Sequence, residues 1–183
     1  EEIVRNSITY KSVSKSFNLS AMRCAYMFST NREYLERITG PGQLRQAMNP
    51  LAIVAAEAAY NECEEWLDQL VEYIDGTQAF VESFIRTNVP YVESVKPEGT
   101  YLAWLDVRKA LDKTGATKMA GATDSSTPES IFQRYLVEHA NIHINPGSSY
   151  GLGGSGRMRM NIATSRQLVK LALKNMADAL TNA

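Results

Sequence analysis

Cysteine and histidine are scarce in this sequence of 183 residues, which contains two of each. Cys24 and Cys63 are too few for a disulfide framework and lack the paired spacing of a zinc site, so we interpret both as structural thiols in a reducing compartment. His139 and His143 lie four positions apart, but a helix end is expected between them, and no cluster of cysteines or carboxylates joins them. The sequence therefore predicts no metal site.

Long apolar runs and an excess of one charge are also absent. No apolar run approaches the roughly 20 residues that cross a bilayer, and the opening EEIVRNS has neither the basic nor the apolar region of a signal peptide. The formal net charge is −1, with both signs interspersed, which gives no electrostatic footprint for nucleic acid or an anionic membrane. We therefore expect a cytoplasmic protein that binds small molecules or other proteins, with neither nucleic acid nor membrane as a partner.

The hydrophobic pattern predicts two parts of different architecture. The first part is a short α/β beginning followed by long helices, and the second is a mixture of strands and helices. Asn31 and Asn49 stand at the expected starts of two helices, and Thr127 stands at the start of a third. In chain order, the expected elements are strands at 8–11 and 25–28, helices at 32–38, from 49 and at 62–88, a hairpin at 92–95 and 100–107, a small polar surface loop at 113–126, a helix from 127, a strand at 141–144, a glycine-serine loop at 146–156, a strand at 157–163 and a helix from 165.

Two further patterns are read as structural. Gly151 to Gly156 matches the G-x-G-x-x-G string of dinucleotide-binding proteins, but an alternating strand pattern follows it instead of a helix. The aromatic residues Trp66, Tyr101 and Trp104 have no basic stripe beside them and are expected in the core.

The stretch YKSVSKSFNLSAMRCAY carries the main chemical signal. An amine that performs covalent chemistry must lose its proton near neutral pH, and a nearby positive charge such as Arg23 favours that loss for Lys15. Ser12 and Ser14 add hydroxyl donors, and an arginine fork suits a phosphate. The set suits a ligand with both an aldehyde and a phosphate, such as pyridoxal phosphate. On spacing alone, a solvated loop lysine is the alternative.

The segment SVSKSFNLSAMR resembles the lysine motif of fold-type-I pyridoxal-phosphate enzymes of the class I/II aminotransferase superfamily, in the form typical of the MalY/PatB type of cystathionine β-lyases. The stretches AAEAAYNECEEWLDQLVEYI, PEGTYLAWLDVR and NPGSSYGLGGSGRMRMNIAT agree with it in order and spacing. The resemblance implies an α/β class fold, the C-terminal part of an aspartate-aminotransferase-like subunit. Residues 1–60 would then end the large cofactor-binding domain, 61–90 would form an interdomain helix, and 91–183 would form the small α+β domain.

The resemblance also assigns the site residues. It makes Lys15 the catalytic Schiff-base lysine and places Ser12, Ser14 and Arg23 around the phosphate of pyridoxal 5′-phosphate. It selects Arg159 as the arginine that binds the substrate α-carboxylate. The pattern alone allows Arg157 as well, because residues two apart on a strand face the same way.

The expected activity is a C–S β-lyase that cleaves cystathionine, cysteine or a cysteine conjugate to thiol, pyruvate and ammonia. An amino acid aminotransferase and a non-catalytic aminotransferase-like domain of a regulator are the alternatives. Because the sequence opens 14 residues before Lys15, we expect the N-terminal half of the subunit to lie outside it. The resemblance also implies an amino acid substrate and a homodimer.

Overall fold

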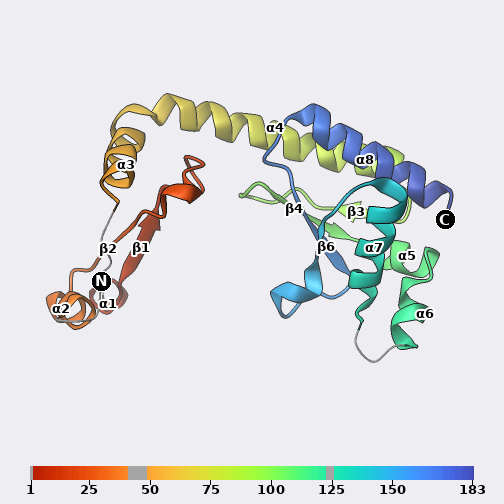
Figure 1. Cartoon of the computed structure of the whole chain (residues 1–183), viewed down its shortest axis with the longest axis horizontal. Coiled ribbons are helices and arrows are strands. Elements are labelled where there is room, and N and C mark those ends of the chain that lie inside the picture. The colour runs from red at the N-terminus through yellow and green to blue at the C-terminus, as the bar shows by residue number, and fades with distance from the viewer. Residues whose placement is uncertain (1, 41–48, 123–125) are drawn as a thin grey trace. The chain divides into compact units, whose positions relative to one another are not determined.

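The computed structural model describes residues 2–40, 49–122 and 126–183. Internal contacts divide the chain into two compact units, Glu1–Val71 and Glu72–Ala183. The division falls within the long helix α4 (Glu64–Asn88), which is labelled in Figure 1. Each unit is described by itself, and the predicted division into residues 1–60, 61–90 and 91–183 stays a prediction.

The first unit is built around a two-stranded antiparallel sheet. Strands β1 and β2 pair from Thr9 opposite Phe28 to Ser12 opposite Ala25, close to the predicted strands. The predicted helix caps are confirmed: Asn31 accepts a hydrogen bond from the N–H of Glu33, and Asn49 accepts one from Leu51. The elements of this unit are α1 (Glu2–Arg5), β1 (Thr9–Ser12), a 3₁₀ turn η1 (Ser20–Met22), β2 (Ala25–Phe28), α2 (Arg32–Thr39), α3 (Pro50–Glu62) and the start of α4.

Aromatic rings, largely open to solvent, follow one another across the first unit. The ring of Phe17 lies 5.7 Å from Tyr60 and 6.2 Å from Trp66, and Tyr26 lies 5.9 Å from Tyr60. Trp66 is 46% exposed, so the prediction that it belongs to the core is wrong within this unit. The error arises because helical spacing identifies an apolar stripe but does not show what covers it.

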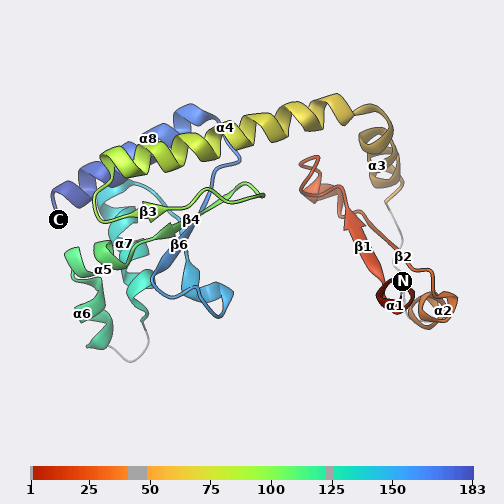
Figure 2. The ribbon, with the colours of Figure 1, turned by 180° about the vertical axis from the view of Figure 1, so that it is seen from behind.

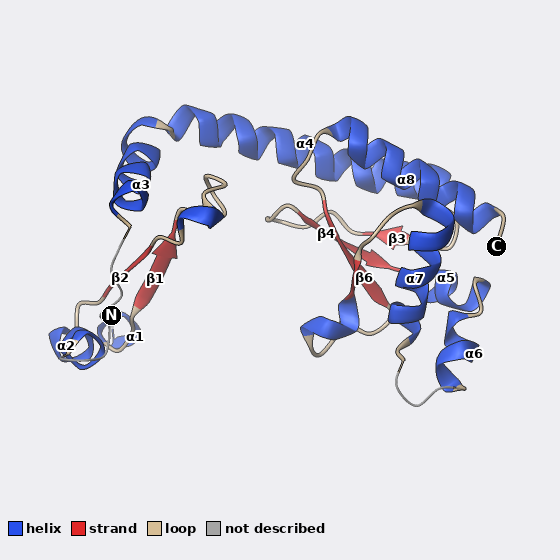
Figure 3. Ribbon diagram, in the orientation of Figure 1, coloured by secondary structure: helices blue, strands red, loops and turns tan. Residues whose placement is uncertain are grey.

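The second unit contains a four-stranded antiparallel sheet in the order β3-β4-β6-β5, shown in red in Figure 3. Central strands β4 and β6 pair from Leu102 opposite Asn161 to Asp106 opposite Arg157. No helix in the described part of the chain is both long and apolar enough to cross a membrane. The elements are the rest of α4, β3 (Glu93–Ser94), β4 (Leu102–Asp106), α5 (Arg108–Lys113), α6 (Ala116–Gly121), α7 (Pro128–Ala140), β5 (Asn145–Pro146), η2 (Gly147–Tyr150), β6 (Arg157–Asn161) and α8 (Arg166–Thr181).

The sheet of the second unit buries one face and leaves the other half-open. Along β4 and β6, Leu105 and Met158 are fully buried, whereas Trp104 and Arg159 on the opposite face are half-buried. Side chains of α4, α7 and α8 form the core with the buried face, and Figures 1 and 2 both show α8 running along α4. The half-open face is therefore the one that can carry a binding site.

Two sequence-based predictions fail in the second unit. The segment 113–126 was expected to be a loop, but it contains helix α6, whose first residue, Ala116, is buried in the core. Positions 123–125 of that segment lie outside the described residues. The expected strand at 141–144 is not formed, because Asn141 ends α7 in the left-handed conformation and the following residues serve as a connection to β5.

The chain between β5 and β6 passes very close to itself at two glycines. A Cβ atom on Gly154 would overlap the carbonyl group of Gly147, and one on Gly147 would overlap the carbonyl of Gly154. Both overlaps are with backbone, which cannot rotate aside as a flexible side chain could. Glycine is therefore required at both positions for this loop to close.

We predict that Gly154→Ala in the full-length polypeptide lowers the free energy of unfolding by about 2 kcal/mol or more, because an added methyl group must displace the backbone of Gly147. Gly121→Ala is the matched control: its Cβ meets nothing within 4 Å and it lies at the end of a helix, so its effect should stay within about 0.5 kcal/mol. Chemical denaturation of the two variants measures the difference, and equal stabilities would contradict the close crossing.

Candidate active site

The predicted lysine lies in the turn that follows β1. Val13 is 1% exposed and anchors the start of this turn, while the side chain of Lys15 is exposed. The hydroxyl of Ser12 donates to the carbonyl of Cys24 at 2.8 Å and accepts from the N–H of Ser14 at 3.1 Å. These local hydrogen bonds tie the two ends of the turn together.

Three serine hydroxyls lie in the turn around Lys15. The hydroxyls of Ser12 and Ser14 share a hydrogen bond of 2.7 Å. Ser20 donates to the carbonyl of Ser14 at 3.0 Å and receives a long hydrogen bond of 3.5 Å from Nζ of Lys15. Sequence reasoning did not identify Ser20, although it stands inside the quoted motif, because its role depends on how the turn folds back.

Arg23 completes the turn in a strained backbone conformation. Its φ of 51° and ψ of 45° lie in the left-handed region, where residues other than glycine are uncommon. Its N–H donates to the carbonyl of Ser20 at 3.3 Å, and its guanidinium is exposed. Among the described residues, neither Arg23 nor Lys15 forms an ion pair, so both charges are available to a ligand.

The structure thus brings four predicted residues into one turn. Ser12, Ser14, Lys15 and Arg23 lie between the end of β1 and the start of β2. Two hydroxyls and a guanidinium are donors that suit a phosphate, and a primary amine suits an aldehyde. This donor set fits pyridoxal phosphate. A hollow of about 450 Å³ beside the turn is lined in part by Ser12, Phe17 and Tyr60.

Arg159, the predicted carboxylate ligand, belongs to the second unit and lies on the half-open face of its sheet. On strand β6 it stands between Trp104 of β4 and Asn145 of β5. Its guanidinium carbon lies 3.9 Å from the centre of the Tyr150 ring, a close cation–π contact, and that ring meets Trp104 edge-on at 6.2 Å. Within the described residues, its buried Nε has no hydrogen-bond partner.

The neighbouring arginine is engaged elsewhere. Arg157 lies on the same face, as predicted, but its Nη1 is 3.8 Å from Oδ2 of Asp106. Arg108 holds the same carboxylate at 2.6 Å, and the hydrogen bonds from Arg108, with the charge of Arg157, lower the pKa of Asp106. The pattern left Arg157 and Arg159 as equal candidates, whereas in the structure only Arg159 has a buried donor free of a partner among the described side chains.

Tyr150 and Trp104 are the two residues of this face that sequence reasoning missed as site residues. Tyr150 stands in the segment expected to be a glycine-serine loop, and Trp104 was expected in the core. The alternation of strand 102–106 could have placed Trp104 opposite the buried residues, on the face of Arg159. No pattern in the sequence could have placed Tyr150 over the guanidinium.

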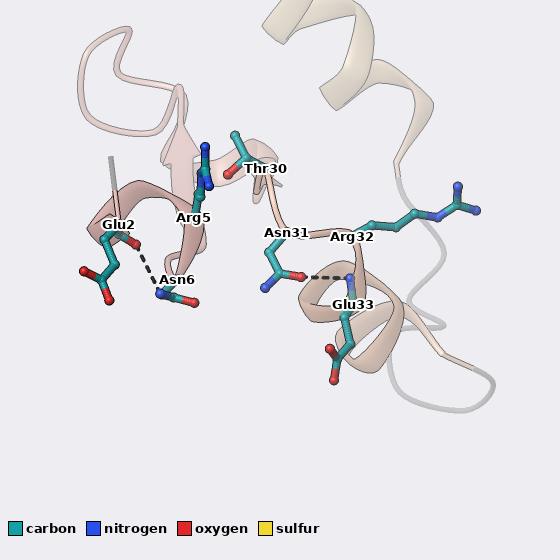
Figure 4. A pocket seen from close by; sticks show the side chains of 7 residues that line it. All are labelled: Glu2, Arg5, Asn6, Thr30, Asn31, Arg32 and Glu33. Carbon is teal, nitrogen blue, oxygen red and sulfur yellow. Dashed lines mark hydrogen bonds between the residues drawn. The ribbon is translucent and has the colours of Figure 1, made fainter.

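A separate hollow in the first unit lies between α1 and the start of α2 (Figure 4). Its side chains include Glu2, Arg5, Asn31 and Glu33, and the dashed hydrogen bond from Glu33 to Asn31 is the helix cap already described. These side chains are polar and partly or fully exposed, and none of the predicted site residues lies there. Its position therefore gives it no part in the proposed chemistry.

Known proteins are similar to this chain over nearly its whole length. The cystathionine β-lyase PatB of Bacillus subtilis is 29% identical over 179 residues, covering 96% of this chain and 42% of PatB. The protein MalY of Escherichia coli is 29% identical over 171 residues, covering 91% of this chain and 40% of MalY. The crystal structure of cystalysin from Treponema denticola, which contains pyridoxal 5′-phosphate, superposes with a TM-score of 0.80 and 27% identity.

These matches also show which part of a subunit the chain represents. The superposition with cystalysin covers 99% of this chain but 43% of the cystalysin chain. The chain therefore spans less than half the length of the relatives that it matches. The predicted fold, the C-terminal part of an aminotransferase-like subunit, is confirmed. The model of the aminotransferase class I and II family matches residues 3–175, and the chain belongs to that family.

Proposed function

We propose that this chain is the C-terminal part of a pyridoxal-phosphate-dependent C–S β-lyase that cleaves cystathionine, cysteine or a cysteine conjugate to thiol, pyruvate and ammonia. The observation that carries the proposal is the turn after β1, where two hydroxyls 2.7 Å apart lie beside the exposed Lys15 and Arg23. The similarity to proteins named cystathionine β-lyase supports the choice of reaction. Because those relatives are more than twice as long, the activity belongs to a whole subunit.

The residues of the turn divide the binding of the cofactor between them. The hydroxyls of Ser12 and Ser14 would hold the phosphate by turning their protons from Cys24 and Ser12 toward it, and the guanidinium of Arg23 would donate to it as well. Nζ of Lys15 would hold the aldehyde carbon. When bound, pyridoxal phosphate supplies a protonated ring that takes up the negative charge formed at the substrate Cα. The free amine of Lys15 would be the base that removes the Cα proton.

Arg159 would orient the substrate through its α-carboxylate. The guanidinium of Arg159 is half-buried and forms no ion pair among the described residues, so it can bind a carboxylate without first breaking one. The Tyr150 ring fixes the plane of that guanidinium, which limits the directions from which the carboxylate can bind. Fixing the carboxylate restricts rotation of the substrate and so sets which bond at Cα is broken.

The same residues also suit an aminotransferase, which is the runner-up. The resemblance implies a homodimer, and the sequence pattern predicts a cytoplasmic protein. The two reactions differ in their products: a β-lyase releases pyruvate and thiol with no added keto acid, whereas a transaminase requires one. Assaying the full-length polypeptide with L-cystathionine, with and without a keto acid, distinguishes them. A cofactor-loaded polypeptide inactive in both assays would favour the regulator alternative.

For the lysine, we expect borohydride reduction of the full-length, cofactor-loaded protein to attach a pyridoxyl label to Lys15, mapped by peptide mass spectrometry. Lys15→Ala should carry no label and lose at least about 100-fold in kcat, because the amine that moves the Cα proton is gone. Lys170→Ala, which changes an exposed lysine on α8, is the control and should keep both label and activity. A label on any other lysine refutes the assignment.

For the two arginines, we expect Arg159→Ala to raise KM for L-cystathionine about 30-fold, because a charge-assisted pair is worth about 2 kcal/mol. Arg157→Ala is the matched variant from the same strand and face, and its KM should change less than about 3-fold because its contact with Asp106 is a partly exposed ion pair. Steady-state kinetics of the two variants decides the assignment. A larger effect at Arg157 would reverse it.

A further inference from the structure

Glu129 is a buried carboxylate to which the proposed chemistry assigns no role. It is 2% exposed and stands in the first turn of α7. Carboxylates are almost never fully buried unless they are paired, yet no cation lies within ion-pair distance of Glu129 among the described residues. Its neutral partners must therefore compensate the cost of burying the charge.

Those partners come mostly from one segment, residues 147–156. Oε1 of Glu129 accepts a short hydrogen bond from the N–H of Gly156 and a long one of 3.5 Å from the hydroxyl of Ser155. The hydroxyls of Ser148 and Thr127 also act to lower the pKa of this carboxyl. Glu129 thus holds residues 155–156, next to the point where the loop crosses itself at Gly147 and Gly154.

The charge on Glu129 persists at neutral pH. Burial by itself raises the pKa of this carboxyl, but the hydrogen bonds from the N–H of Gly156, its own N–H and the Thr127 and Ser148 hydroxyls outweigh burial and lower the pKa. An acidic residue in the first helical turn commonly serves the helix dipole while exposed to water. Glu129 is buried and directed at a different segment, so the dipole does not account for it.

The loop that Glu129 closes carries Tyr150. The loop begins with η2, which ends at Tyr150, and it returns through Gly156, whose carbonyl accepts from the N–H of Val107 at 3.0 Å. Gly156 has a φ of 73°, a conformation that L side chains rarely adopt. Between these two fixed ends, the Tyr150 ring lies 3.9 Å from the guanidinium of Arg159.

We propose that Glu129 is a positioning residue for carboxylate binding: by holding residues 155–156 beside the crossing of Gly147 and Gly154, it keeps the Tyr150 ring on Arg159 and so presets the guanidinium for the substrate. This inference rests on the proposed role of Arg159. Glu129 itself touches neither substrate nor cofactor in this proposal. Its removal should therefore weaken substrate binding through Arg159 and leave the proton transfer at Lys15 intact.

The test is a double-mutant cycle in the full-length, cofactor-loaded protein, with L-cystathionine as substrate. Glu129→Gln should raise KM about 5-fold or more with kcat changed less than about 2-fold, because it disturbs binding and not the chemical step. In an Arg159→Ala background the same substitution should change KM less than about 2-fold, since residues that act as a unit are not additive. Glu138→Gln, an exposed glutamate on the same helix, is the control and should be neutral.

A second readout does not depend on activity. Hydrogen exchange at the amide of Gly156 should become at least about 10-fold faster in Glu129→Gln than in Glu138→Gln, because its acceptor is weakened. If Glu129→Gln does not fold, Tyr150→Leu removes the ring while keeping the loop and should raise KM in the same way, again without effect in the Arg159→Ala background.

The outcomes separate this inference from the proposed function. An Arg159→Ala variant with unchanged KM shows that the carboxylate assignment is wrong. If Arg159→Ala raises KM while the effect of Glu129→Gln is absent, or is fully additive with it, Arg159 keeps its role and the positioning role of Glu129 is overturned. Non-additive effects on KM together with faster exchange at Gly156 support it.

Discussion

The contact between Tyr150 and Arg159 is the interaction on which the candidate substrate site depends. A buried N–H without a partner costs about 1–3 kcal/mol, and a cation–π contact contributes about 0.5–2 kcal/mol. The two are of similar size, so the ring offsets much of the cost of keeping Nε of Arg159 away from water. The ring also holds the guanidinium in one plane before a ligand binds, so less freedom is lost on binding, which is the physical meaning of preorganisation.

The distribution of charge around this face keeps Arg159 available. Two carboxylates of the second unit, those of Asp106 on β4 and Glu129 on α7, already have their hydrogen-bond or ion-pair partners. Asp106 is held by Arg108 and Arg157, and Glu129 is satisfied by backbone and hydroxyl donors. Had either carboxylate lacked these partners, it would attract Arg159 and compete with a substrate carboxylate. Two residues apart on one strand, Arg157 and Arg159 therefore differ in whether a carboxylate already engages them.

Local signals in the sequence were sufficient for much of the fold. The caps at Asn31 and Asn49 and the alternation along β4 and β6 depend on residues within a few positions, and they were predicted correctly. Predictions failed where a distant partner decides the outcome. Helix α6 is stabilised by burial of Ala116 in a core built from other elements, and Trp66 has the spacing of a core residue while half of its surface is exposed. Helical or strand periodicity does not carry that information.

The lysine turn of the first unit and the candidate carboxylate site of the second unit differ in the same respect. The lysine turn is stabilised by hydrogen bonds among Ser12, Ser14, Ser20 and Cys24, all within 13 residues of sequence, so a short motif specifies both its chemistry and its shape. The carboxylate site combines a strand arginine, a loop tyrosine and a glutamate from α7, and 30 positions separate Glu129 from Arg159. Its residue types are common, and only the folded sheet and the glycine crossing bring them together. The position of the Tyr150 ring depends on the backbone crossing, so a side chain at Gly147 or Gly154 would move it. The side chains of Ser149 and Leu152 are exposed, so the loop can tolerate substitutions there.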